Sequence, residues 1–250
     1  MSGHSKWSSI KHKKGAKDAK RGQIFTKLAR AIQVAAREGG PDPAGNAALQ
    51  TAIDKAREAS MPKDNIERAI QKGSGAGADA ESFEAVTYEG YGPGGVAILV
   101  EALTDNRNRT SSDVRHLFNK HGGNLGEPGS VAWIFEKKGE LVIDAERYSE
   151  DELFPAIDAG AEDVNLDENV YEIVTDPAAF TQVKKALEDA GVEFDSADLT
   201  MRPTTQVPVD ESQATQVVRL IDALEENDDV QAVHANFEAD ADVLERAATA

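Results

Sequence analysis

The spacing of apolar residues predicts three amphipathic helices in the first third of the chain. The first runs from residue 24 to a Gly and Pro breaker at 39–43, and the second from about 46 to 59. Pro62 suits the first turn of the third, which Gly73 ends. Three helices of this size can form a small bundle. The residues expected on its apolar faces are Ile24, Leu28, Ile32, Ala35, Leu49, Ala52, Ile53, Ala56, Ile66, Ala69 and Ile70.

The spacing of apolar residues changes from a helical to a strand pattern after a linker of small residues at 73–80. Residues 83–91 and 96–102 are predicted strands, joined by a glycine-rich hairpin loop at 90–95. A helix with an apolar stripe of Val114, Leu117 and Phe118 follows and ends at Gly122. Its predicted N-cap is Thr110, Ser111 or Ser112, which places Arg107 and Arg109 just ahead of it.

The second half of the chain begins with the order strand, helix, strand, strand, helix, strand over residues 131–205. This is the order of the split βαβ, or ferredoxin-like, arrangement. A helix at 211–226 and a strand at 230–236 remain, and alone they cannot bury a core. We therefore expect them to return to the sheet of the 80–130 segment, whereas residues 239–250 are expected to be loosely held.

These patterns predict an α+β fold of three parts. The first is a basic arm plus helical bundle at 1–76. The second is a discontinuous central α+β domain at 80–130 and 206–240. The third is a ferredoxin-like domain at 131–205, inserted into the second.

Charge is distributed unevenly along the chain. The first thirty residues, here called the basic arm, contain nine Lys or Arg and one acidic residue, whereas the whole chain carries a net charge of −18. Such asymmetry indicates an arm that meets a polyanion, although a solvated tail is the alternative. Two features favour binding. The basic charges are spaced in pairs, which suits a phosphate backbone, and Trp7 can stack on a base or anchor the arm to the protein.

The residues expected to contact nucleic acid are most of the arm's cations, its Trp and one of its His, with two arginines of the central segment. The two arginines could equally be loop charges. The full set is Lys6, Trp7, Lys11, His12, Lys13, Lys14, Lys17, Lys20, Arg21, Lys27, Arg107 and Arg109.

Several kinds of chemistry are not expected. The absence of Cys excludes disulfides, thiolate catalysis and a zinc ribbon, and five scattered His are poor material for a metal site. No catalytic Ser or zinc-protease motif occurs, and the acidic pairs at 225–226 and 228–229 are expected to be solvated. No apolar run approaches the roughly 20 residues of a membrane span. We therefore expect a cytoplasmic protein that is not an enzyme, with no cofactor and no small-molecule substrate.

Four separated stretches resemble one known family, the YebC/PmpR family. They are SGHSKWSSIKHKKGAKDAKRGQIFTKLAR at 2–30, MPKDNIERAI at 61–70, YEGYGPGGVAILVEALTDNRNRT at 88–110 and GGNLGEPGSVAWIFEKKG at 122–139. The resemblance implies a helical bundle, a central α+β domain and an inserted ferredoxin-like domain. It also implies a DNA-binding transcriptional regulator. The family includes a mitochondrial translational activator of cytochrome oxidase, and its bacterial members are similar to factors that help ribosomes through proline-rich stretches.

The expected function is therefore regulation of gene expression through nucleic-acid binding, with DNA as the first candidate ligand. A translation factor that binds ribosomal RNA and relieves stalling at proline-rich sequences is the alternative. No recognition-helix signature is visible in the sequence, so little discrimination between DNA sequences is expected.

Overall fold

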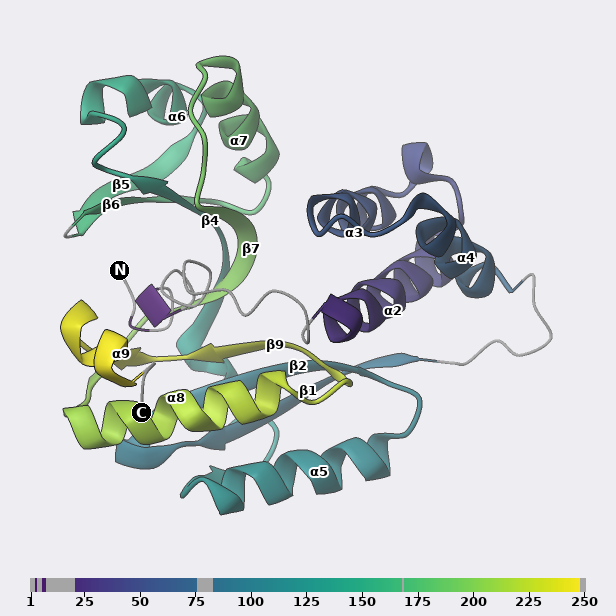
Figure 1. Cartoon of the computed structure of the whole chain (residues 1–250), viewed down its shortest axis with the longest axis vertical. Coiled ribbons are helices and arrows are strands. Elements are labelled where there is room, and N and C mark those ends of the chain that lie inside the picture. Colours follow the sequence, from purple (N-terminus) through teal and green to yellow (C-terminus); the bar gives the residue numbers. More distant parts are fainter. Residues whose placement is uncertain (1–2, 4–5, 8–20, 76–82, 168, 248–250) are drawn as a thin grey trace.

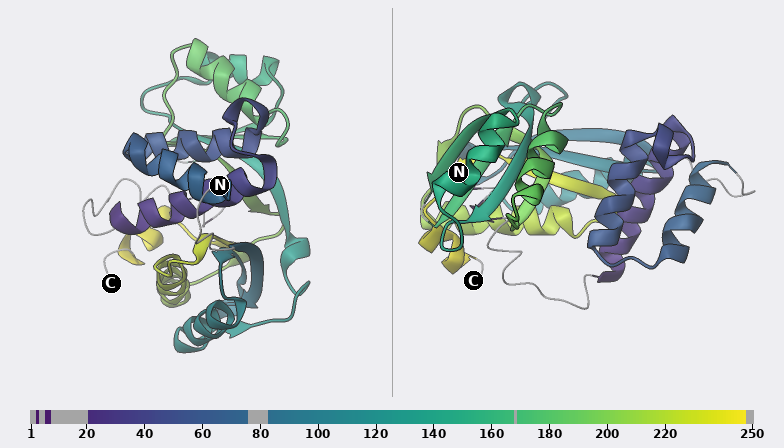
Figure 2. Two further views of the ribbon diagram at one scale, coloured as in Figure 1. Left: turned by 90° about the vertical axis from the view of Figure 1, so that its right-hand side faces the viewer. Right: turned by 90° about the horizontal axis from the view of Figure 1, so that it is seen from above.

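A computed structural model of the chain describes residues 3, 6–7, 21–75, 83–167 and 169–247. The molecule is α+β, as the patterns predicted, with a helical bundle beside two four-stranded sheets (Figure 1). Seen from above, the bundle stands to one side of the two sheets (Figure 2, right). Among the described residues, no helix is both long enough and apolar enough to cross a membrane.

The bundle consists of α2 (Arg21–Gly39), α3 (Ala47–Glu58) and α4 (Lys63–Gly73). Its core is closed by apolar residues of all three helices. Asn46 fixes the turn into α3, because its carboxamide accepts from Leu49 N and donates to Ala35 O and Gly40 O. A Cβ on Gly73 would lie 2.3 Å from Gln33 O, so α4 packs directly on the backbone of α2.

Two details of the bundle differ from the prediction. α2 begins at Arg21, three residues earlier than its apolar period indicated. Ile24 is 45% exposed, because the core contributed by α3 and α4 reaches only as far as Phe25 and Leu28. The first turn of α2 therefore extends beyond the bundle.

The central sheet has the order β3-β1-β2-β9, with all neighbours antiparallel. Its strands are β3 (Asn124–Leu125), β1 (Glu84–Tyr91), β2 (Ala97–Thr104) and β9 (Val230–Ala235). α5 (Arg107–Lys120) and α8 (Glu211–Glu225) contribute Phe118, Leu220 and Ile221 to the hydrophobic cluster that these strands share. β9 thus brings the end of the chain back to the hairpin of β1 and β2.

The C-terminal segment was expected to be loosely held, and this expectation is wrong for its described part. Residues 241–247 form the helix α9 (Ala241–Ala247), in which Leu244 is fully buried in the core of the central sheet. The helix has only seven residues, of which two have large apolar side chains. This is too few to show the helical spacing of apolar residues in the sequence. Contact with α8 provides the apolar surface that holds the helix. Residues 248–250 lie outside the described part.

The second sheet has the order β5-β6-β4-β7, and α6 and α7 pack on one of its faces. All its neighbouring strands are antiparallel, and the chain order βαββαβ makes it a split βαβ arrangement. The elements are β4 (Phe135–Asp144), α6 (Phe154–Asp158), β5 (Ala161–Asp167), β6 (Val170–Thr175), α7 (Phe180–Asp189) and β7 (Ser196–Pro203).

Residues just before and at the start of β4 connect the two sheets. Val131, Ile134 and Phe135 pack against Ala97 and Leu99 of β2, and this small cluster is separate from the core beneath α5 and α8. The second sheet is thereby held against the first at the point where the chain enters it. A short parallel pair, β8 (Val207–Pro208) with β10 (Phe237–Glu238), follows the return of the chain.

A buried carboxylate shapes the loop before β4. Glu89 accepts from the backbone N–H of Gly129 at 2.6 Å and from those of Val131 and Ala132 at 2.7 Å. Burial alone raises the pKa of Glu89, but the three N–H donors together outweigh it and hold the pKa below its usual value. The charged carboxylate therefore fixes the conformation of this loop through three hydrogen bonds to its backbone.

Replacing Glu89 by glutamine is expected to lower the free energy of unfolding by about 2 kcal/mol, because an amide cannot accept three N–H bonds as a carboxylate does. The amides of Gly129, Val131 and Ala132 should then exchange with solvent faster, while amides in β2 should not change. Hydrogen exchange followed by NMR measures both groups in one experiment. Unchanged exchange in the loop would show that Glu89 does not hold it.

Candidate nucleic-acid interface

The residues predicted to contact nucleic acid divide into two sets. Six of them lie outside the described residues: Lys11, His12, Lys13, Lys14, Lys17 and Lys20. The other six are placed by the structure, and five of these make contacts with acidic side chains, helix-end carbonyls or the protein core, namely Lys6, Trp7, Lys27, Arg107 and Arg109. These contacts show how the beginning of the chain is attached to the rest of the molecule.

Trp7 is buried, with 4% of its surface exposed, in the hydrophobic cluster of the central sheet that includes Phe237 and Leu244. Lys6 beside it lies with Nζ 3.1 Å from a carboxylate oxygen of Asp167 in β5. A Cβ on Gly3 would lie 2.7 Å from Phe237, so the backbone itself is in close contact there. Lys6 and Trp7 thus contact different sheets, and Trp7 takes the second of its two predicted roles, that of an anchor.

The first half of α2 docks on the C-terminal end of α8. Lys27 Nζ donates to Glu225 O at 2.5 Å, and the side-chain amide of Gln23 donates to Glu226 O. The last carbonyls of a helix have no partners within it and carry partial negative charge, so a cation stabilises them. Lys27 and Gln23 thus satisfy groups that α8 leaves unpaired.

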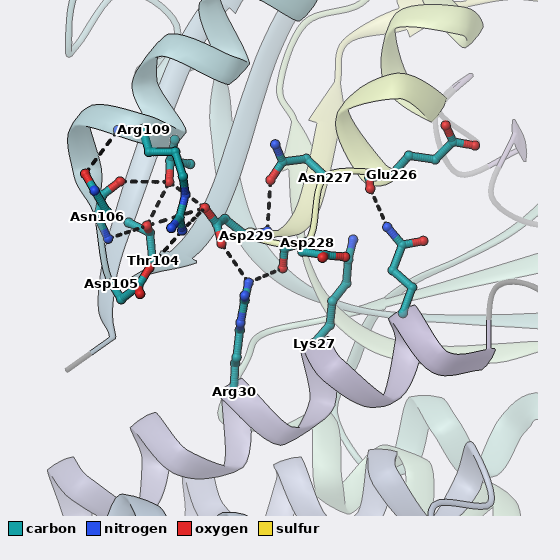
Figure 3. Close-up of polar contacts among 12 residues, drawn as sticks. Lys27, Arg30, Thr104, Asp105, Asn106, Arg109, Glu226, Asn227, Asp228 and Asp229 are labelled. Atoms are coloured by element: carbon teal, nitrogen blue, oxygen red, sulfur yellow. Dashed lines mark hydrogen bonds and ion pairs between the residues drawn. The ribbon is translucent and has the colours of Figure 1, made fainter. Parts of the chain in front are cut away.

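Arg30 extends this contact to the loop after α8. Its Nη1 donates to Asp228 O at 2.5 Å and to Asp229 Oδ1 at 2.8 Å (Figure 3). Its guanidinium also lies 5.0 Å from the centre of the Phe83 ring. The segment Glu225–Asp229, which we call the acidic segment, therefore receives three side chains of α2.

Asp229 lies at the centre of this network and is only 4% exposed. Its Oδ2 accepts from Arg109 at 2.8 Å and from the Thr110 hydroxyl at 2.7 Å, while Oδ1 accepts from Arg30. Burial raises the pKa of Asp229, but the bonds from Thr110 and Arg109 and the charges of Arg109 and Arg30 hold it below its usual value. The expectation of a solvated acidic pair at 228–229 is wrong for Asp229, because donors of α2 and α5 surround it.

The start of α5 also differs from the prediction. Asn106, whose Oδ1 accepts from Arg109 N at 3.1 Å, is the N-cap, and the helix begins at Arg107. Arg107 and Arg109 therefore lie in the first turn and not ahead of it. Thr110, one of the predicted caps, is fully buried and bonds to Asp229 instead.

Replacing Asp229 by asparagine is expected to lower the free energy of unfolding by about 2 kcal/mol at pH 7, because Arg30 and Arg109 lose their shared carboxylate. The pKa of Asp229 is lower in the folded state than in the unfolded state, where it is about 3.9. Its contribution is therefore complete above that pH and is lost as the pH falls through the folded pKa. Urea unfolding at pH 7 and pH 3 should show a smaller difference between the two proteins at pH 3. A difference that does not depend on pH would contradict this assignment.

Arg21, Arg107 and Arg109 are the predicted contacts that are exposed among the described residues, although Arg109 is paired with Asp105 and Asp229. Arg21 is exposed, with its guanidinium 5.4 Å from the Phe25 ring centre. Arg107 is 63% exposed, with Nη1 3.7 Å from Glu84, and it lines a cleft of about 290 Å³ together with Ser111 and the exposed Arg115. The structure therefore does not gather the described contact residues into one patch.

Sequence reasoning missed the interdomain contact of Arg30 with Asp229. The one available signal was that Arg30 stands one helical turn after Lys27, so both side chains leave the same face of α2. A cleft of about 590 Å³ adjoins the contact. It is lined by Arg30 and Asp229 and also by Lys72, Asp105 and Arg109. Among the described residues, no group of three or more His, Asp or Glu could hold a metal ion.

Comparison with known proteins assigns both parts that this contact joins. Residues 5–76 match the family model described as the TACO1/YebC protein N-terminal domain, and residues 83–237 match the model of the TACO1/YebC second and third domain. The chain belongs to the TACO1/YebC family. The resemblance drawn from the four sequence stretches is thereby confirmed. Arg30 lies in the segment matched by the first model and Asp229 in the segment matched by the second.

Relatives of similar length share more than half of their residues with this TACO1/YebC chain. A protein of Rubrobacter xylanophilus is 57% identical over 245 residues, covering 98% of each chain, and is named "Probable transcriptional regulatory protein". A Geobacter sulfurreducens protein, also named as a probable transcriptional regulatory protein, is 54% identical over 246 residues, covering 98% of this chain and 99% of its own. The crystal structure of a conserved hypothetical protein of Aquifex aeolicus is similar with a TM-score of 0.79 at 53% identity, covering 88% of this chain and 91% of that one.

Proposed function

We propose that this protein regulates gene expression by binding nucleic acid, with DNA as its principal ligand. The observation that supports the proposal is the charge of the basic arm. It contains nine Lys or Arg, although the whole chain has a net charge of −18. The names of the relatives, probable transcriptional regulatory proteins, favour DNA over ribosomal RNA. In this proposal the contact residues are those named from the sequence, from Lys6 to Lys27 with Arg107 and Arg109, except Trp7, which is buried in the core of the central sheet.

The physical basis of binding is neutralisation of phosphates. Each Lys or Arg that meets a phosphate releases condensed counterions, which favours binding without reference to sequence. The acidic remainder of the molecule repels the polymer elsewhere and confines contact to the cationic surfaces. Arg21 and Arg107 are exposed and can contribute directly. The protein is not proposed to catalyse a reaction or to hold a cofactor.

The test is binding of the full chain to labelled random duplex DNA and to ribosomal RNA fragments, measured by fluorescence anisotropy over a range of salt concentrations. The expected result is tighter binding to duplex DNA, with an affinity that falls as salt rises. Absence of DNA binding at low salt would refute the proposal. Tighter binding to ribosomal RNA would instead support the translation factor.

Low discrimination between DNA sequences is also expected, because the sequence shows no recognition-helix signature. The preference for any selected sequence over random duplex should stay below about 10³-fold, the lower limit for specific binders. Selection from a random library followed by competition measures this ratio. A footprint with a larger preference would contradict the expectation.

A further inference from the structure

The described contacts between the bundle and the rest of the molecule are mainly ionic or polar. Two ion pairs add to the contacts of α2 with the acidic segment. Lys55 Nζ of α3 lies 2.6 Å from Asp198 Oδ1 in β7, and Lys184 Nζ of α7 lies 3.4 Å from Glu58 Oε1 in α3. The hydrophobic core of the bundle is a cluster of its own and includes no residue of either sheet. Contacts of this kind are weakened by salt, and domains held by them are able to separate.

The acidic segment offers α2 the same chemistry as a phosphate backbone. Lys27 and Arg30, one helical turn apart, each bond to oxygen acceptors of the segment, and one of these is a carboxylate. Amino and guanidinium groups recognise phosphates through bonds of the same kind and length. The acidic segment therefore occupies these two cations as a polyanion would.

Asp229 does not depend on Arg30 for its own pairing. Its other oxygen keeps the bonds from Arg109 at 2.8 Å and Thr110 at 2.7 Å, both within the central domain. Departure of α2 would leave Asp229 paired, and so would avoid the large cost of an isolated buried charge. The bundle would also keep its own core intact, since that core is closed within its three helices.

We propose that Lys27 and Arg30, with the exposed Lys72 on the wall of the adjoining cleft, form a second phosphate-binding site that the acidic segment masks in the free protein. A polyanion competes with the segment for these cations and separates α2 from α8. Only open molecules can use this site. The apparent affinity of the site for nucleic acid is therefore its intrinsic affinity multiplied by the fraction of molecules that are open. This inference deepens the proposed function, on which the identity of the polyanion rests.

The first experiment locks the contact closed. The chain has no cysteine, and Thr26 and Asn227 both line the cleft beside Arg30, so a T26C/N227C protein can be bridged by a short bis-maleimide. The same variant capped with N-ethylmaleimide is the matched control. The bridged protein should bind random duplex DNA at least about tenfold more weakly than the capped one. Equal affinity of the two forms would overturn the masking, while leaving the proposed function in place.

The second experiment follows opening without nucleic acid. Fluorophores on Q71C in α4 and N119C in α5, both exposed positions, report the separation of the bundle from the central sheet. Inorganic polyphosphate should lower the energy transfer, and K27A/R30A should show the lower value before polyphosphate is added. Circular dichroism must show unchanged helix content. No change in transfer at saturating polyphosphate would overturn the inference. Opening by polyphosphate in a protein that binds neither DNA nor RNA would sustain the masked site and refute the proposed function.

Discussion

Replacing Trp7 by alanine is expected to lower the free energy of unfolding by about 3–5 kcal/mol, the cost of removing a large buried aromatic side chain. Trp7 is almost fully buried in the core of the central sheet although it stands near the start of the chain. A tryptophan exposed to solvent on an unattached tail would contribute nothing to the free energy of unfolding. Urea unfolding of the full chain, followed by circular dichroism, measures the difference.

Trp7→Phe is the control for this prediction. Among the described residues, the indole N–H of Trp7 has no hydrogen-bond acceptor. Phenylalanine therefore keeps an aromatic ring in the core and removes no bond, so its cost should be smaller, about 1–2 kcal/mol. Equal stability of Trp7→Ala and the unchanged protein would show that the arm is not anchored through this residue in solution.

Replacing Lys11, Lys13, Lys14 and Lys17 together by alanine is expected to weaken binding to every duplex sequence by up to about 10³-fold at 0.1 M salt. The physical reason is the loss of phosphate contacts and of the counterions that they release. If all four lysines contact phosphates, the slope of log K against log salt should become smaller by about 3.6, at about 0.9 for each contact. Anisotropy titrations at several salt concentrations give both quantities.

A variant with the same change in net charge separates local contact from overall charge. It replaces four exposed lysines of the bundle, α5, β4 and α7 by alanine, namely Lys63, Lys120, Lys137 and Lys185. Its salt slope should stay close to that of the unchanged protein. If both variants lose the same affinity and slope, the arm has no special part in binding.

The masked site and the lysines at 11–17 make distinct contributions to these measurements. The lysines of the quadruple variant precede α2 in the sequence, whereas Lys27 and Arg30 lie in α2 and contact the acidic segment. Closing the bridge between residues 26 and 227 should therefore weaken binding further in the quadruple variant. Such an additional loss is expected only if the two groups of cations act at separate places on the polymer.

Local periodicity determined most of the secondary structure of this protein. The helix predicted at 211–226 is α8 (Glu211–Glu225), and the glycine-rich stretch at 90–95 joins β1 and β2 as an antiparallel hairpin. These elements depend on residues a few positions apart, whose spacing is visible in the chain itself. The four family stretches were likewise readable because they are contiguous.

Only the tertiary structure decided which charges and aromatic residues are available to a partner. Trp7 could stack on a base or anchor the arm, and its burial in the central core decides for the anchor in this state. Arg30 and Asp229 are 199 residues apart in sequence, and no local pattern connects them. Whether a charge is solvated depends on the groups that surround it in space, and the chain brings those groups from distant segments.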